Sequence, residues 1–182
     1  MDLHAQNWLT PPPVLTTARL SLRPLAEVDP QVLTAAVNDF DISKWLTVVP
    51  FPYVLADAVD FIAANQAGAL RTWAIYDATQ FIGCIGADRE LGYWLTKASW
   101  GQGFATEAGC AVLGHVFAQA SVRNIGSSYF EGNVGSQNVL QKLGFVEFGK
   151  DTHHCVARNA KVPVRNMRLT RARWQSLNAS SA

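Results

Sequence analysis

Near its middle the chain reads Trp100-Gly101-Gln102-Gly103-Phe104-Ala105-Thr106-Glu107, and this stretch says more about the fold than any other. It lies between a predicted strand at 90–96 and a predicted helix at 103–120. Glycines let a backbone approach a ligand closely, and the first turn of a helix offers unpaired N–H groups and a dipole that favours negative charge. The stretch predicts a site for an anion such as a pyrophosphate, with a plain tight turn as the alternative.

Two other kinds of phosphate-binding loop do not fit this stretch. No G-x-x-x-x-G-K-S/T sequence occurs in the chain, and the three glycines of a G-x-G-x-x-G loop are missing. Nucleotide hydrolysis and dinucleotide binding therefore lose their main support.

The pattern of apolar residues around the stretch predicts both strands and helices. The predicted strands are residues 19–23, 72–76, 81–87, 90–96, 125–131, 145–148 and 164–169. The predicted helices are residues 30–37, 57–67, 103–120 and 136–143. The three strands between 72 and 96 predict an antiparallel meander, and the whole order predicts an α+β or mixed α/β fold.

Composition limits the class of protein. The 182 residues match one domain, and 49% hydrophobic with 16% charged residues favour a packed core over disorder. A net charge of +1 gives no overall field toward nucleic acid or anionic lipid, so we expect neither nucleic acid nor a membrane as partner. Arg165, Arg168, Arg171 and Arg173 form only a short cluster, which we interpret as solvated side chains on a strand and its edge.

Cysteines and the start of the chain bear on location and metal chemistry. Cys84, Cys110 and Cys155 are far apart and form no C-x-x-C pair, which predicts free thiols. His153 and His154 precede Cys155 directly, but adjacent side chains of a strand point to opposite faces, so we predict no metal site. Without a basic-then-apolar start or a run of about 20 apolar residues, we expect a soluble, cytoplasmic protein.

Several motifs, in order, resemble one enzyme superfamily. Gly103 and Ala105 match the acyl-CoA signature Gln/Arg-x-x-Gly-x-Gly/Ala of the GNAT N-acetyltransferases, while Trp100 replaces the usual Gln or Arg. The RimJ/RimL-like branch carries Trp-Gly-x-Gly-Tyr/Phe-Ala-Thr-Glu-Ala here, and residues 100–108 match it. The other matching segments, between about residues 17 and 174, are Thr17-Ala18-Arg19-Leu20-Ser21-Leu22-Arg23-Pro24, Pro50-Phe51-Pro52-Tyr53, Glu90-Leu91-Gly92-Tyr93-Trp94-Leu95, Gly132-Asn133-Val134-Gly135-Ser136 and Leu143-Gly144-Phe145.

The resemblance implies a GNAT-like fold: a strongly twisted, mixed and mostly antiparallel sheet, flanked by helices and splayed between its fourth and fifth strands. It implies one domain at 17–174, an N-terminal extension at 1–16 and a C-terminal tail at 175–182. Acetyl-CoA would be the cosubstrate, with its pantetheine arm in the splay and its thioester oxygen on the backbone near Leu95. The residues that would bind acetyl-CoA are Leu95, Gly101, Gln102, Gly103, Phe104, Ala105, Thr106, Asn133 and Ser136.

The implied reaction needs a base and an acid. An amine attacks a thioester only when neutral, and the departing thiolate gains from a proton donor. Leu140 stands where many relatives have an acidic tyrosine, so the predicted acid is Ser136, with simple helix capping as its alternative. The predicted base is Glu90, with a solvated carboxylate paired with Arg89 or another cation as its alternative, and Glu131 is the rival base.

The hypothesis is an acetyl-CoA-dependent N-acetyltransferase that transfers acetyl directly to a primary amine, either a protein N-terminal α-amine or a small-molecule amine. The alternative is a catalytically weak acyl-CoA-binding or regulatory module, motivated by the missing tyrosine. The expected partners are acetyl-CoA and the amine acceptor, and a homodimer is left open. For Asn133, cofactor or acceptor binding stands beside a purely conformational role after Gly132.

Overall fold

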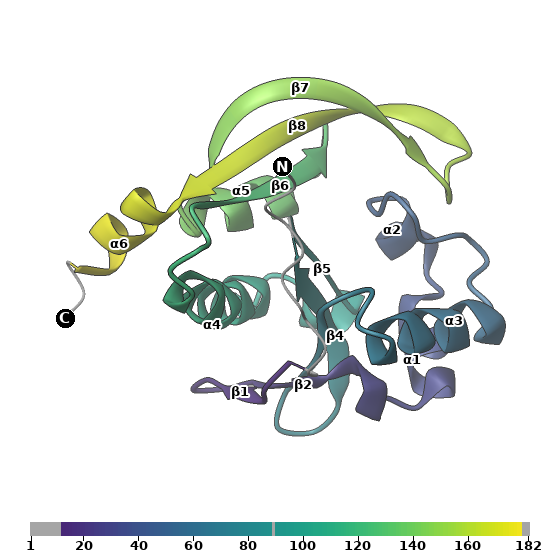
Figure 1. Ribbon diagram of the computed structural model, residues 1–182. Coiled ribbons are helices and arrows are strands. Elements are labelled where there is room, and N and C mark those ends of the chain that lie inside the picture. Colours follow the sequence, from purple (N-terminus) through teal and green to yellow (C-terminus); the bar gives the residue numbers. More distant parts are fainter. Residues whose placement is uncertain (1–11, 89, 180–182) are drawn as a thin grey trace.

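The computed structural model describes residues 12–88 and 90–179 and contains two β-sheets with helices around them (Figure 1). A five-stranded sheet has the order β1-β2-β3-β4-β5, and a three-stranded sheet has the order β6-β8-β7. The strands are β1 (Leu15–Thr16), β2 (Ser21–Pro24), β3 (Thr72–Tyr76), β4 (Phe81–Ala87), β5 (Leu91–Leu95), β6 (Asn124–Phe130), β7 (Val146–Cys155) and β8 (Ala160–Thr170). The helices are α1 (Pro30–Val37), α2 (Phe40–Ser43), α3 (Leu55–Gln66), α4 (Phe104–Ala118), α5 (Val134–Lys142) and α6 (Arg171–Ala179), with short 3-10 turns η1 (Leu25–Glu27) and η2 (Lys97–Ser99).

The fold is of the mixed α+β class, as predicted. Every pair of neighbouring strands within the two sheets is antiparallel, and β3, β4 and β5 form the expected meander. In the described part of the chain, the two sheets are joined by one isolated parallel bridge, between Glu90 and Gly126. The splay that the family resemblance implies therefore lies between β5 and β6.

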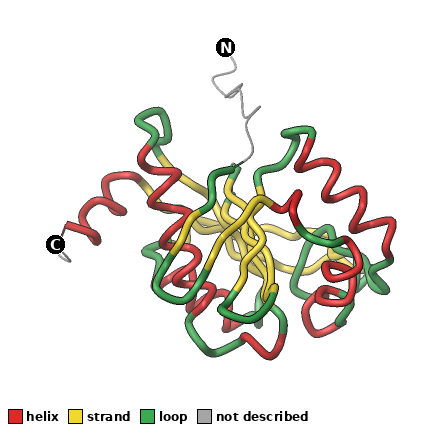
Figure 2. The backbone as a smooth tube through the Cα atoms, turned by 90° about the horizontal axis from the view of Figure 1, so that it is seen from below, coloured by secondary structure: helices red, strands yellow, loops and turns green. Residues whose placement is uncertain are grey.

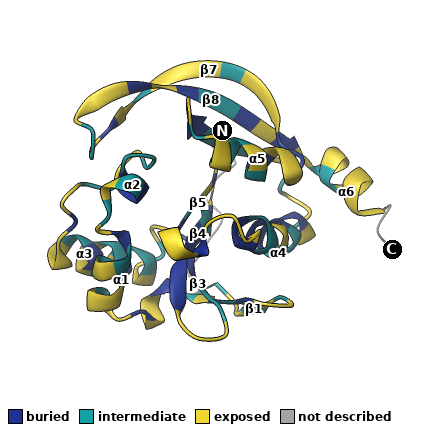
Figure 3. Cartoon of the chain, turned by 180° about the vertical axis from the view of Figure 1, so that it is seen from behind, coloured by how far each residue is buried: buried dark blue, intermediate teal, exposed yellow. Residues whose placement is uncertain are grey.

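Helices cover both faces of the five-stranded sheet, which gives it a core on each side (Figures 1 and 2). On one face α4 packs Val112 into a cluster that includes Leu95 of β5 and also contacts Tyr93. On the other face α1 packs Leu33 into a second cluster, against which Trp94 lies. Figure 3 shows the buried residues gathered in β3, β4 and α4, while β7 and α6 are largely exposed. Neighbouring residues of β5 thus face different sides, as strand alternation requires.

A carboxylate in the first turns of α4 clamps the segment before β2. Glu107 Oε1 accepts hydrogen bonds from Thr17 Oγ1 (2.6 Å) and from the Arg19 backbone N–H (2.9 Å), while Oε2 accepts from Arg19 Nε (2.7 Å). Burial alone would raise the pKa of Glu107, but these hydrogen bonds and the Arg19 charge hold it below its ordinary value. The clamp gives a structural reason why the motifs at 17–24 and 100–108 occur together.

The β7–β8 hairpin is much longer than the closing strands predicted at 145–148 and 164–169, and it arches over the rest of the fold (Figure 1). Most side chains of β7 are exposed on both faces, so the strand lacks an apolar alternation. Pro163 lies inside β8, and a proline at that position argues against a strand in the sequence. At the tip, Val156 N–H donates to the Thr47 carbonyl (3.1 Å), and the Cys155 thiol donates to the Leu46 carbonyl (3.4 Å). These bonds fasten the hairpin to the loop after α2.

The interpretation of the C-terminal arginines as solvated is wrong for three of them, including Arg173, whose Nε–H donates to the Gly144 carbonyl (2.6 Å). The Arg171 guanidinium, at the start of the unpredicted helix α6, donates to the carbonyls of Phe117, Gln119 and Val122. The last carbonyls of a helix have no partner within that helix, so Arg171 satisfies the end of α4. Arg165 pairs with Glu131 at 2.7 Å.

The predicted domain limits stay predictions. β1 lies within the predicted extension at 1–16 and pairs with β2, while α6 runs through the predicted limit at 174. Residues 1–11 and 180–182 of the predicted extension and tail lie outside the described residues.

Other features of the described chain bear on its environment. Cys84, Cys110 and Cys155 are free thiols. Among residues 12–88 and 90–179, no helix has both the length and the apolar character needed to cross a bilayer.

Replacing Leu140 by alanine tests the core beneath α5. Leu140 is fully buried in the α4-side cluster, so Leu140→Ala should lower the free energy of unfolding by about 2–5 kcal/mol through lost burial and a cavity. Urea denaturation measures this change. The control is Val59→Ala at a position 48% exposed on α3, expected within about 0.5 kcal/mol of the wild type. Equal losses in both variants would contradict the described packing.

The Glu107 clamp makes stability depend on pH with a definite sign. Because its pKa is lower in the folded than in the unfolded chain, its contribution is complete above about pH 4.3 and fades as pH falls through the folded pKa. Glu107→Gln should therefore be less stable than wild type at pH 7, with the difference shrinking in acid. Urea midpoints at pH 7 and at about pH 4 measure this difference. The control is Glu27→Gln, which removes an exposed carboxylate that forms no ion pair with another described residue and should change little at pH 7. A gap that stays constant into acid would refute the clamp.

Candidate active site

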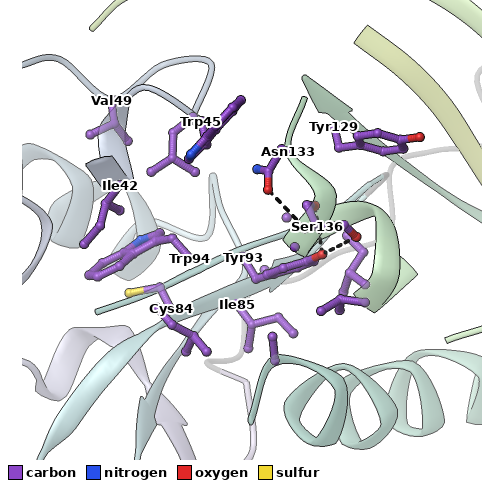
Figure 4. Close-up of a pocket in the computed structure, with 18 of the residues that line it drawn as sticks. Ile42, Trp45, Val49, Cys84, Ile85, Tyr93, Trp94, Tyr129, Asn133 and Ser136 are labelled. Carbon is purple, nitrogen blue, oxygen red and sulfur yellow. Dashed lines mark hydrogen bonds between the residues drawn. The ribbon is translucent and has the colours of Figure 1, made fainter. Parts of the chain in front are cut away.

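A cavity of about 1070 Å³ lies where the two sheets separate (Figure 4). It is bordered by β4 and β5 of one sheet, β6 of the other, the first turns of α4 and α5, and residues from α1 to α3. Ligand pockets commonly measure about 300–1,000 Å³. The cavity thus has room for a large ligand and a smaller second one.

The cavity exists because β5 loses its neighbour on the β6 side. Thr96 N–H donates to the Ile82 carbonyl (2.8 Å), so the even-numbered residues of β5 pair with β4 and the odd-numbered ones turn their backbone groups the other way. Ser127 Oγ still reaches across from β6 to the Leu91 carbonyl (2.8 Å). Farther along, the backbone of Leu95 lines the cavity with no strand on that side.

Trp100, which stands where the signature has Gln or Arg, completes the end of β5. Its indole N–H donates to the Leu95 carbonyl at 2.8 Å. This bond satisfies the acceptor of Leu95 and leaves its N–H as the group offered to the cavity. A donor at this point fits the expectation that the backbone near Leu95 holds a thioester oxygen.

The turn into α4 borders the cavity and has the features of an anion site. Gly101 (φ 74°) and Gly103 (φ 81°) take left-handed backbone conformations that favour glycine. Gly103 is the N-cap, and no side chain of a described residue caps the helix by a hydrogen bond, which leaves the N–H groups of Phe104, Ala105 and Thr106 without an intrahelical partner. These unpaired donors and the positive end of the helix dipole would attract a phosphate group.

Most of the predicted cofactor residues line this cavity, and Gln102 is the exception. The Gln102 side chain turns back and donates to the Ala98 carbonyl (2.7 Å), while the Gln102 backbone carbonyl accepts from the Arg19 guanidinium (3.1 Å). The neighbouring residues of the loop therefore remain better candidates than Gln102 for binding acetyl-CoA. The predicted residues that line the cavity are Leu95, Gly101, Gly103, Phe104, Ala105, Thr106, Asn133 and Ser136.

Ser136 belongs to a small polar network at the start of α5. The Asn133 side-chain oxygen accepts from the Ser136 backbone N–H (3.1 Å), so Asn133 is the side chain that caps the helix. The Ser136 hydroxyl is instead hydrogen-bonded to the Tyr93 hydroxyl (2.9 Å). Figure 4 shows the two groups meeting beside the cavity.

Tyr93 is the side chain that the sequence analysis missed. Its single hydroxyl proton can point either to the Ser136 hydroxyl oxygen or to the Ser136 carbonyl oxygen, which lies 3.3 Å away. Burial raises the pKa of Tyr93 to about 12, with the Ser136 hydrogen bond acting in the opposite direction, so the phenol keeps its proton at neutral pH. The sequence did contain a signal for Tyr93: it is the one hydroxyl-bearing side chain among the residues of β5, and by strand alternation it lies on the face opposite to Glu90.

The two candidate bases occupy different surroundings. Glu90 lines the cavity at the start of β5, where the sheets are joined. Glu131 is not among the lining residues and forms an ion pair with Arg165, which also contacts Glu147 (2.9 Å). Geometry therefore favours Glu90 over Glu131. Arg89, the cation suggested as a partner of Glu90, lies outside the described residues.

The half of the cavity on the α1–α3 side has mostly apolar walls. Figure 4 shows Ile42, Trp45 and Val49 facing Trp94 and Cys84 across this space. In the sequence these residues are spread over more than fifty positions, so no local pattern joined them.

Comparison with known proteins places this geometry in a family. Residues 19–146, more than two thirds of the chain, match the model of the acetyltransferase (GNAT) domain. The uncharacterized N-acetyltransferase YoaA of Bacillus subtilis (strain 168) is 26% identical over 150 residues, covering 75% of this chain and 85% of YoaA.

Two solved structures share the fold at low sequence identity. RimL, described as a ribosomal L7/L12 alpha-N-protein acetyltransferase in complex with coenzyme A, has a TM-score of 0.73 at 15% identity, covering 87% of this chain and 98% of RimL. The spermidine N-acetyltransferase from Vibrio cholerae, in complex with CoA and spermine, has a TM-score of 0.74 at 18% identity, covering 87% and 99%. With the glycine turn, the split sheets and the family match in agreement, this chain belongs to the GNAT family and is an acetyl-CoA-dependent N-acetyltransferase.

Proposed function

We propose that the enzyme acetylates a primary amine, either a protein N-terminal α-amine or a small-molecule amine, by direct transfer within a ternary complex. The observation that carries this proposal is the division of groups around β5. Tyr93 and Ser136 meet on the α4 and α5 side, whereas Glu90 shares the alternate strand positions with Trp94, which packs on the α1 and α3 side. Direct transfer needs a proton acceptor on the amine side and a donor on the thiol side.

In the proposed reaction Glu90 takes a proton from the acceptor ammonium, directly or through a water. The neutral nitrogen attacks the thioester carbon, and the C–N bond forms as the carbonyl oxygen gains negative charge. The Leu95 N–H would hold this oxygen, a kind of interaction worth about 2.7–4 kcal/mol in measured cases, and the bond from Trp100 to the Leu95 carbonyl supports this role. The C–S bond then breaks as the carbonyl re-forms, and the Ser136 hydroxyl gives its proton to the thiolate. The second proton of the nitrogen passes through water to restore the serine hydroxyl, and Glu90 releases the first one to solvent.

Tyr93 acts in this proposal by positioning Ser136. Because its phenol stays protonated at neutral pH, it can donate to Ser136 Oγ and leave the serine proton free for the thiolate. The Asn133 cap fixes the backbone of the same residue. Two bonds thus orient one hydroxyl, and none of the proposed steps needs a metal.

Acetyl-CoA would lie with its pyrophosphate at the Gly101 to Thr106 turn and its thioester between Leu95 and Ser136. We also propose that the enzyme belongs to the RimJ/RimL-like branch, which is supported by Trp100 and its bond to the end of β5. A cytoplasmic location is a further part of the proposal. The named acceptors of the two structural relatives are a ribosomal protein and a polyamine, so both acceptor classes belong to the proposal.

A catalytically weak acyl-CoA-binding module is the second candidate function. It is favoured by Leu140, which stands in the place of the acidic tyrosine of many relatives and is fully buried. Release of free thiol from acetyl-CoA in the presence of amines separates the two, because a binding module would give none.

Cofactor binding is tested by thermal shift with acetyl-CoA, CoA and ATP. Both CoA compounds should stabilise the protein selectively, by about 2.7 kcal/mol at 100 times the dissociation constant. Gly103→Ala should reduce this stabilisation, because its φ of 81° strains any side chain beside the N–H groups. Gly114→Ala in α4, where an added Cβ meets nothing within 4 Å, is the matched control. Absence of a shift with either CoA compound would contradict the site.

Proton transfer is tested by removing each group singly. Ser136→Ala and Glu90→Gln should each lower kcat by about 10²–10⁴-fold and leave acetyl-CoA affinity nearly unchanged. Tyr93→Phe should also lower kcat, by less, because Ser136 remains. Steady-state kinetics and acetyl-CoA titration measure these effects. Glu131→Gln is the control for the rival carboxylate, and a loss there equal to that of Glu90→Gln would refute the assigned base.

A further inference from the structure

The α1–α3 side of the cavity has a composition that selects among amines. Its walls are apolar and include the rings of Trp45 and Trp94, with Ile42 on α2 and Val49 in the loop between α2 and α3. The loop that carries Trp45 is held in place by the β7–β8 tip, where Arg158 lies over the Trp45 ring at 4.6 Å. Apolar and aromatic walls of this kind favour a ligand with an apolar body of ring size.

Charges on the lining disfavour an anionic acceptor. Asp57, Asp60, Asp88 and Glu90 all border the cavity. Of the described residues that line it, Lys142 on α5 is the only lysine or arginine, and it lies on the side of the predicted acetyl-CoA site. Among the described residues that line the α1–α3 side, an acceptor carboxylate would meet carboxylates and no lysine or arginine, whereas an ammonium ion would be attracted.

Tyr53 provides an independent indication of a ligand. Its side chain is 6% exposed and lines the cavity, yet its hydroxyl has no hydrogen-bond partner among residues 12–88 and 90–179. Burial, followed by the nearby Asp57, Cys84 and Asp60, raises the pKa of Tyr53 to about 12, so the hydroxyl stays protonated. The hydroxyl is not enclosed in the core but opens onto the cavity, so a ligand atom placed beside it can form a hydrogen bond with it and add to the affinity.

We propose that the acceptor is a small primary amine on an apolar, ring-sized body without a carboxylate, and that it carries a hydroxyl which hydrogen-bonds to Tyr53. This inference deepens the proposed function and rests on it for the position of the reacting amine. The amine lies toward Glu90, the body lies between Trp45 and Trp94, and the hydroxyl lies toward the start of α3. Binding would satisfy the unpaired Tyr53 hydroxyl and leave no ligand charge without a counterpart.

Tyramine, phenethylamine and tyrosine are matched probes, since they differ by one hydroxyl or one carboxylate. Calorimetric titration into protein saturated with CoA, which has no acetyl group to transfer, should show tyramine binding about 3–10-fold more tightly than phenethylamine. Tyrosine should bind at least about 10-fold more weakly than tyramine. Tyr53→Phe should abolish the difference between tyramine and phenethylamine without lowering the melting temperature.

Tyr76→Phe is the control, because it removes a phenol hydroxyl on β3 that does not border the cavity. It should preserve the preference for tyramine. Tighter binding of tyrosine, spermidine or a short peptide than of tyramine would overturn the inference, as would equal weakening of both amines by Tyr53→Phe. Thiol release is measured separately. Tyramine binding without turnover of any amine would leave this inference standing and refute the proposed transfer, whereas turnover of peptides without tyramine binding would do the reverse.

Discussion

The loss of backbone pairing between β5 and β6 is the constraint on which the rest of this structure depends. Buried N–H and C=O groups need partners, and a strand that leaves its neighbour must find others. Ser127 supplies one to Leu91 near the junction, and Trp100 supplies one to the carbonyl of Leu95. The Leu95 N–H is the donor that remains, and it faces the cavity. The same break in the sheet therefore creates both the space for a ligand and a group that can bind it.

Strand alternation turns this gap into two chemically different halves. On the α4 and α5 side, Tyr93, Ser136 and Asn133 form a chain of hydrogen bonds. On the α1 and α3 side, Trp94 belongs to an apolar wall whose charges are carboxylates. A thioester and a cationic amine make opposite demands on their surroundings, and β5 separates the two environments by the width of one strand.

Several tethers hold the borders of this cavity in place. Glu107 ties the turn at Gly103 to the segment before β2, and the β7–β8 tip holds the loop after α2. Lys97 Nζ lies 2.6 Å from an Asp41 carboxylate oxygen and links the loop after β5 to α2. Exposed ion pairs of this kind contribute little stability, but they limit the relative positions of segments that border the site.

Local patterns in the sequence determined the meander, the long helix, the glycine turn and the family, because each depends on residues close together in the chain. They also singled out Ser136 and Glu90, both of which border the cavity, although their roles remain proposals. Only the tertiary structure decided the length of the β7–β8 hairpin, the ion pair that takes Glu131 away from the cavity, and the partnership of Tyr93 with Ser136, 43 residues apart. The acceptor side of the cavity was also decided only by the tertiary structure. Its walls come from separate segments that no periodicity joins, and they meet only because helices pack on both faces of a sheet that splits at β5.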